Sequence, residues 1–77
     1  MRRKPFGSRE LGAQISSARV KSGLSQEALG RAIGKVSRQQ VYRWEAGGRT
    51  PSALALRAIA EALGVSADEL LGLRERQ

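Results

Sequence analysis

Four side chains between positions 38 and 43 carry hydrogen-bonding groups suited to the edges of DNA bases: Arg38, Gln39, Tyr42 and Arg43. An arginine can bond guanine through two parallel hydrogen bonds, and a glutamine can bond adenine in a similar way. In a helix, Val41 and Trp44 are three apart and mark an apolar side. At about 100° per residue, Gln39, Tyr42 and Arg43 point away from that side, and the preceding arginine flanks it. The stretch therefore predicts a base-reading helix; the alternative is an ordinary solvated helix face.

Two serines and a glycine define the elements that position this helix. Ser25 and Ser37 are good N-caps, because a serine oxygen can accept a hydrogen bond from a free amide of the first helical turn. Gly34 suits the end of the helix that Ser25 opens, because glycine adopts the left-handed conformation at little cost. Helix, tight turn and helix form the unit that places a second helix in the major groove of DNA.

Apolar spacing predicts a further helix on the N-terminal side of this unit. It begins at Ser8 or a neighbour, ends near Ser22 and has an inward stripe at Leu11, Ile15 and Ala18. Within the helix opened by Ser25, Gly30 costs about 1 kcal/mol relative to alanine. That cost fits two helices that cross there without room for a side chain.

Two more helices are expected on the C-terminal side, which makes five helices and no strands. Thr50 before Pro51 indicates an N-cap followed by a proline at the first helical position. The helix that follows closes at Gly64, carries Leu54 at one edge and has these inward residues: Leu56, Ile59, Ala60 and Leu63. Ser66 and Glu69 then form a capping box. The last short helix supplies Leu70 and Leu71, with Leu73 as a further candidate for the core.

Composition excludes several classes of site. The 77 residues make one domain with a small core, and they include no cysteine and no histidine. Disulfides, most zinc sites and the commonest nucleophile–base pairs are therefore not expected. The seven acidic residues form no clustered pair that could hold Mg²⁺ on a basic face. We expect no catalytic residue, no metal, no cofactor and no small-molecule ligand.

The charge balance favours a polyanionic partner, since the net charge is +7 and the pI is near 11.4. Six basic residues lie in a stretch whose only carboxylate is that of Glu45: Arg31, Lys35, Arg38, Arg43, Arg49 and Arg57. A membrane surface would also attract this charge, but a basic membrane helix usually leaves a broad apolar face free for lipid. No apolar run approaches the roughly 18 residues of a membrane span. We therefore expect a soluble, cytoplasmic protein.

Residues 1–8 read as a flexible basic arm, residues 9–73 as the folded domain and residues 74–77 as a frayed tail. Arg2, Arg3 and Lys4 of the arm could lie along phosphates or in a minor groove. A solubilising tail is the alternative.

Phosphate contacts are expected around the proposed base-reading helix. Gln26 lies in the first turn of its own helix, where its amide and the free backbone amides can meet a phosphate. Arg49 and the neighbouring loop amides could hold another. The full set of predicted phosphate contacts is Gln26, Lys35, Ser37, Gln40, Gly48 and Arg49.

Several short motifs, taken together, carry a resemblance to a known family. They are Leu24-Ser-Gln-Glu, Leu29-Gly, Ile33-Gly, Val36-Ser, Arg43-Trp-Glu, Gly47, Arg49-Thr-Pro-Ser and Ala62-Leu-Gly-Val-Ser-Ala-Asp-Glu-Leu-Leu. Over residues 11–72 the chain resembles the Cro/repressor-type (Xre-like) helix-turn-helix domain. The resemblance implies an all-α, compact five-helix lambda-repressor-like DNA-binding domain. Residues 37–44 would be its recognition helix.

The resemblance also implies residue roles. It assigns base contacts to Arg38, Gln39 and Arg43, and phosphate contacts to Gln26 and to the loop at 47–49. It further implies that Arg19 pairs with Glu45 as a structural ion pair. The chain departs from the family in a turn that is one residue longer, with Lys35 as the extra residue. It also has Ala46 where asparagine is common, so the helix end there relies on Gly47.

The function implied is that of a sequence-specific double-stranded DNA-binding transcriptional regulator and not an enzyme. We expect a repressor that binds a palindromic operator as a homodimer and is nucleoid-associated when bound. The alternative is an antitoxin-type interaction protein that also autoregulates its own operon.

Overall fold

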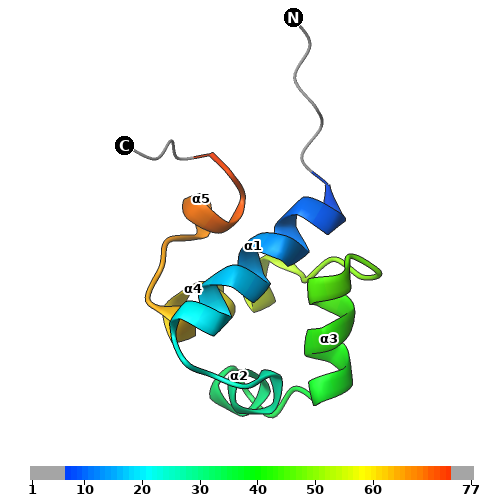
Figure 1. Ribbon diagram of the computed structural model, residues 1–77, viewed down its shortest axis with the longest axis vertical. Coiled ribbons are helices and arrows are strands. Elements are labelled where there is room, and N and C mark those ends of the chain that lie inside the picture. Colours follow the sequence, from blue (N-terminus) through cyan, green and yellow to red (C-terminus); the bar gives the residue numbers. More distant parts are fainter. Residues whose placement is uncertain (1–6, 74–77) are drawn as a thin grey trace, which may run out of the picture.

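The computed structural model describes residues 7–73, and these form five helices with no strand among them (Figure 1). The helices are α1 (Ser8–Lys21), α2 (Gln26–Ala32), α3 (Arg38–Ala46), α4 (Ala53–Leu63) and α5 (Ala67–Leu70). The predicted all-α, five-helix fold is confirmed. The expectations for the basic arm over residues 1–6 and for the tail over residues 74–77 lie outside the described residues.

Local capping chemistry explains where three of the helices begin. The side-chain oxygen of Ser25 accepts a hydrogen bond from the amide of Ala28 at 2.9 Å, and Ser37 accepts one from the amide of Gln40 at 3.1 Å. Ser66 and Glu69 form the predicted reciprocal capping box. Each bond satisfies an amide that the helix itself leaves free. These N-caps are confirmed.

The start of α4 was predicted two residues too early. Ser52 is the N-cap, and its side chain accepts a hydrogen bond from the amide of Ala55 at 3.1 Å. Thr50 instead shares a hydroxyl–hydroxyl hydrogen bond with Ser8, and Pro51 is buried. Ser52 can cap the helix in the same way as Thr50. Because α4 begins later, Pro51 is buried and the hydroxyl of Thr50 is hydrogen-bonded to α1.

The first helix begins where it was predicted to begin. Ser8 is the first residue of α1 and therefore does not belong to the arm predicted over residues 1–8, and Gly7 caps the helix. The backbone amide of Gly7 donates a hydrogen bond to a carboxylate oxygen of Glu10 at 3.0 Å. This bond closes the first turn without a capping side chain.

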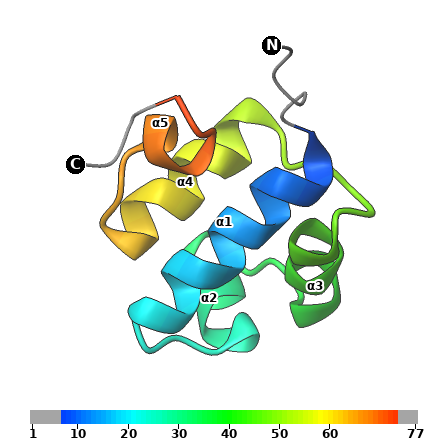
Figure 2. The same cartoon turned by 45° about the horizontal axis from the view of Figure 1, so that its top comes forward.

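Every helix contributes residues to the core: Leu11, Ile15, Leu29, Val41, Trp44, Leu56, Ile59, Ala60, Leu63 and Leu70. Ala18, predicted to face inward, is partly buried against it. Leu24 and Leu71 are partly buried against it. Leu73 is 71% exposed, so its candidacy for the core is wrong, and Leu54 at the edge of α4 is 78% exposed. α1 lies across the middle of the molecule and contacts α3, α4 and α5 (Figure 2).

Two glycines allow the backbones around α3 to approach closely. A Cβ on Gly30 would collide with the carbonyl oxygen of Val36, so the predicted lack of room is confirmed. The colliding group belongs to the turn before α3, however, and not to a crossing helix. A Cβ on Gly12 would collide with the Trp44 carbonyl oxygen and lie 2.5 Å from that of Glu45. α1 therefore crosses α3 backbone to backbone at Gly12, a contact that the sequence analysis missed.

Candidate nucleic-acid interface

One side of α3 is buried and the opposite side is exposed, as the spacing of its apolar residues predicted. Val41 is fully buried and Trp44 is 5% exposed, which fixes the inner side of the helix. The four predicted base-contact residues are all exposed: Arg38, Gln39, Tyr42 and Arg43. Within residues 7–73, no side-chain hydrogen bond or ion pair engages any of the four. Their donors and acceptors are therefore available to a ligand.

A partly buried ion pair fixes the end of α3 against α1. The Nε of Arg19 lies 2.6 Å from Oε2 of Glu45, and its Nη2 donates to Oε1 at 3.1 Å. The third nitrogen, Nη1, donates to the carbonyl oxygen of Leu24 at 2.7 Å. The two side chains are 14% and 7% exposed. The pair joins α1, the α1–α2 loop and α3, so it fixes the position of α3 in the fold.

Gln26 belongs to this network. Its side-chain amide donates to Oε1 of Glu45 at 3.0 Å, which holds the start of α2 beside the end of α3. The amide was predicted to contact a phosphate. The structure uses one of its donors internally, and the side chain keeps a second N–H and its oxygen for other partners.

The turn between α2 and α3 contains two consecutive residues with positive φ angles. α2 ends at Ala32, Gly34 follows with φ +113°, and Lys35 has φ +65°. The chain then returns to α2 through a hydrogen bond from the Val36 amide to the Gly30 carbonyl at 2.9 Å. Lys35 is the only residue other than glycine with a positive φ in the described part of the chain. Its side chain is exposed at the start of α3.

Two predicted phosphate contacts are less available than expected. Gln40 is half-buried, and its Oε1 is buried without a hydrogen-bond partner among the described residues. The amide of Gly48 donates to the Arg43 carbonyl at 3.0 Å, so it is used to close the end of α3. Gly47 supplies the left-handed C-cap with φ +84°, as predicted, and Arg49 in the same loop is exposed.

Two of the six basic residues between positions 31 and 57 form ion pairs within their own helices, and the four without such a pair lie around α3. Arg31 and Arg57 lie 3.6 Å and 3.4 Å from carboxylates one helical turn away on their own helices. The other four basic residues of this stretch form no ion pair within residues 7–73: Lys35, Arg38, Arg43 and Arg49. These four lie on α3 and on the turns that flank it. Of the six cations in this stretch, the four without a carboxylate partner are therefore those nearest the predicted base contacts, where they would attract a polyanion.

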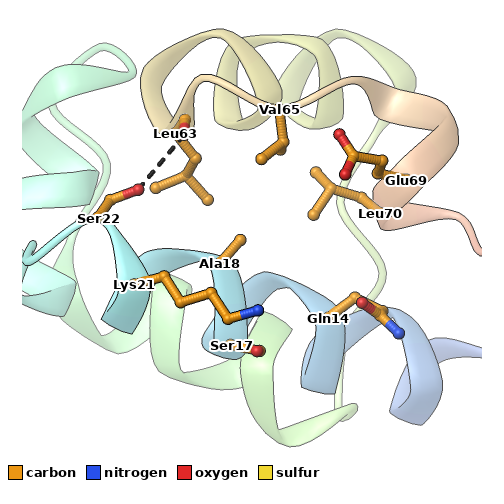
Figure 3. A pocket seen from close by; sticks show the side chains of 9 residues that line it. All are labelled: Gln14, Ser17, Ala18, Lys21, Ser22, Leu63, Val65, Glu69 and Leu70. Atoms are coloured by element: carbon orange, nitrogen blue, oxygen red, sulfur yellow. Dashed lines mark hydrogen bonds between the residues drawn. The ribbon is translucent and has the colours of Figure 1, made fainter. Parts of the chain in front are cut away.

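The side of α1 away from α3 has a different character. A hollow of about 230 Å³ lies there between α1 and the α4–α5 segment (Figure 3). Its lining includes one cation and one carboxylate, those of Lys21 and Glu69, over an apolar floor that contains Leu63 and Leu70. With both signs of charge at its rim, this hollow is not suited to a polyanion.

Neither a metal site nor a membrane span is found in the described part of the chain. No group of three or more acidic side chains gathers there in an arrangement that could hold a metal ion. None of its helices combines the length and the apolar character needed to cross a membrane.

Comparison with known proteins matches this geometry to a family. Residues 15–70 match a family model described as helix-turn-helix. A search of curated proteins gives no match.

Three solved structures illustrate the similarity. The restriction-modification controller protein C.AhdI from Aeromonas hydrophila is 32% identical, with a TM-score of 0.76 over 80% of this chain and 92% of its own. The P22 c2 repressor, solved with a synthetic operator, is 34% identical, with a TM-score of 0.76 over 83% and 96%. The clp gene regulator ClgR from Corynebacterium glutamicum is 28% identical, with a TM-score of 0.83 over 92% and 74%. The chain belongs to the Cro/repressor-type (Xre-like) helix-turn-helix family of DNA-binding transcription regulators.

Proposed function

We propose that this protein is a transcriptional repressor that binds double-stranded DNA with α3 in the major groove. The observation that carries the proposal is the outer face of α3, where four exposed base-reading side chains have no partner within the described residues. Unpaired cations flank them, and the P22 c2 repressor, a similar protein, was solved with an operator. In the proposal Arg38, Gln39, Tyr42 and Arg43 contact base edges.

Phosphate binding is assigned to the groups that border α3. Lys35 and the capped start of α3 at Ser37 lie at one end of the helix, and Arg49 lies at the other. Gln26 adds its remaining donor from the start of α2. Contacts of this kind hold the protein in register on the duplex but carry no sequence information.

The bound form in this proposal is a homodimer on a palindromic operator. A single small module makes a limited interface with DNA, so two copies on half-sites about 34 Å apart supply more affinity and a symmetric preference. The proposal concerns regulation by binding, without catalysis.

Selection of bound duplexes from a randomised DNA pool tests the proposal directly. At about 150 mM salt, where non-specific phosphate binding is weak, we expect a palindrome with half-sites about one helical turn apart. A single half-site would contradict the dimer but not the DNA-binding function. No enrichment would contradict the proposal and favour the antitoxin-type alternative, for which a stoichiometric partner should then co-purify.

Two substitutions separate base reading from phosphate binding. Gln39→Ala should cost about 1–3 kcal/mol of binding free energy and relax the selected motif at one base pair. Arg49→Ala should weaken binding to all sequences alike. Arg57→Ala removes a similar exposed charge from α4 and serves as the matched control. An unchanged motif with Gln39→Ala would contradict the orientation of α3 in the groove.

A further inference from the structure

The first turn of α1 lies directly against the loop that ends α3. A Cβ built on Gly47 would lie 2.8 Å from the Cα of Arg9 and 3.2 Å from its Cβ, so the two backbones touch there. The hydroxyls of Ser8 and Thr50 are hydrogen-bonded across the same boundary. The side chain of Arg9 therefore leaves α1 beside the loop that presents Arg49.

The side chain of Arg9 does not stabilise the described part of the fold through any hydrogen bond or ion pair. Its side chain is exposed and forms no hydrogen bond or ion pair within residues 7–73. The neighbouring carboxylate of Glu10 is turned back onto the amide of Gly7 at 3.0 Å. Since Arg9 contacts no carboxylate there, its guanidinium is available to an anion outside the domain.

The position of Arg9 is also unfavourable for the helix that carries it. The N-terminal end of a helix has a partial positive charge, so a cation in the first turn opposes the macrodipole. α1, α2 and α5 carry acidic residues in their first turns, as this rule predicts. In α1, however, Arg9 stands beside Glu10 in that turn, and the first turn of α3 has Arg38 and no acidic residue. Both arginines lie at helix starts that border the proposed DNA-binding surface.

We infer that Arg9 binds the DNA phosphate backbone and that, with Arg49, it forms a two-cation clamp beyond the C-terminal end of α3. This inference rests on the proposed function. The clamp brings together a residue from the start of α1 and one from the α3–α4 loop, and it extends the contact with the duplex past the recognition helix. It leaves base specificity to α3, because phosphate contacts do not read sequence.

The test compares Arg9→Gln with Lys21→Gln. Both substitutions remove one exposed positive charge from α1, but Lys21 lies in its last turn, beside the hollow on the other side of the helix. Affinity is measured by fluorescence anisotropy over a series of salt concentrations. The probes are a labelled duplex recovered by selection and a labelled duplex of unrelated mixed sequence.

Loss of one phosphate contact has a defined signature. With Arg9→Gln, the slope of log affinity against log salt should become shallower by about 0.9 on both duplexes. If the affinities converge near 1 M salt, that slope corresponds to about a fivefold weaker complex at 0.15 M. The slope for Lys21→Gln should stay at the wild-type value. The melting temperature of Arg9→Gln should equal or exceed that of the wild type, because a cation has left the first turn.

Three outcomes would overturn the inference, and they are distinguishable. If the wild type binds and Arg9→Gln keeps its slope, Arg9 is not in the interface although the proposed function stands. If both variants lose the same slope, the effect is one of net charge and not of a clamp. If Arg9→Gln melts well below Lys21→Gln, Arg9 is a structural residue. If the wild-type protein binds neither duplex, the proposed function itself is contradicted.

Discussion

Replacing Arg19 by leucine tests how strongly the ion pair between α1 and α3 stabilises the domain. The substitution removes three hydrogen bonds: two to the carboxylate of Glu45, at 2.6 Å and 3.1 Å, and one to the Leu24 carbonyl at 2.7 Å. It leaves a carboxylate that is only 7% exposed with the amide of Gln26 as its remaining partner. The aliphatic part of the side chain is retained, so the main loss is electrostatic.

The expected cost is about 3 kcal/mol. Breaking a buried pair by removing one partner costs about 3–5 kcal/mol, because a charge is left without compensation. The lower end applies because the Gln26 bond remains and Arg19 is 14% exposed. A domain of this length has a total stability of about 4–12 kcal/mol. The variant should therefore still fold, with a melting temperature lower by about 12–24 °C.

Thermal and urea unfolding followed by circular dichroism would measure this loss in a double-mutant cycle. The cycle includes Arg19→Leu, Glu45→Leu and the double variant, in which an apolar pair replaces the ion pair and should recover much of the stability. Arg57→Leu is the control, because it breaks an exposed pair that is worth about 0.5 kcal/mol or less. The reasoning would be refuted if Arg19→Leu lowered the melting temperature by less than about 4 °C, the equivalent of roughly 1 kcal/mol. It would also be refuted if the two single changes were additive.

Three further substitutions test the packing and the turn around α3. Gly30→Ala should destabilise the domain by about 1–3 kcal/mol in urea unfolding, because its Cβ would collide with the Val36 carbonyl; an unchanged midpoint would contradict the close approach. Lys35→Gly should raise stability by about 0.5 kcal/mol, since relief of a left-handed residue outweighs the added freedom of the unfolded chain; a lower melting temperature would count against strain at this position. Trp44→Ala should cost about 3–5 kcal/mol, at least as much as Arg19→Leu, because the indole is 5% exposed in a small core; a near-normal melting temperature would show that Trp44 is not a core residue.

The helix caps and the buried side of α3 depend on residues that are close in the sequence, so they could be predicted from the sequence. Ser25 and Ser37 cap α2 and α3 through bonds that span three residues, and Gly47 ends α3 in the left-handed conformation. The spacing of Val41 and Trp44 predicted which side of α3 is buried, since that side follows from helix geometry alone. The exposure of the four predicted base-contact residues on the opposite side followed for the same reason.

The loop before α4 contains two residues that could cap the helix, and the sequence of the loop does not decide between them. Thr50 and Ser52 both precede a helix-compatible stretch, and either could accept the hydrogen bond of an N-cap. The choice of Ser52 depends on the burial of Pro51 and on the contact between Thr50 and Ser8. No pattern within the loop contains that information.

Contacts between distant segments were decided by the tertiary structure. The close approach of Gly12 to α3 and of Arg9 to Gly47 requires α1 to lie across the end of α3. The bond from Gln26 to Glu45 likewise depends on how α2 meets α3. The sequence by itself therefore determined the five helices and the outward face of α3, because hydrogen bonds and periodicity within a helix depend on residues a few positions apart. Only the folded structure decided which groups remain free for DNA, because that depends on which donors and charges meet a partner from another part of the chain.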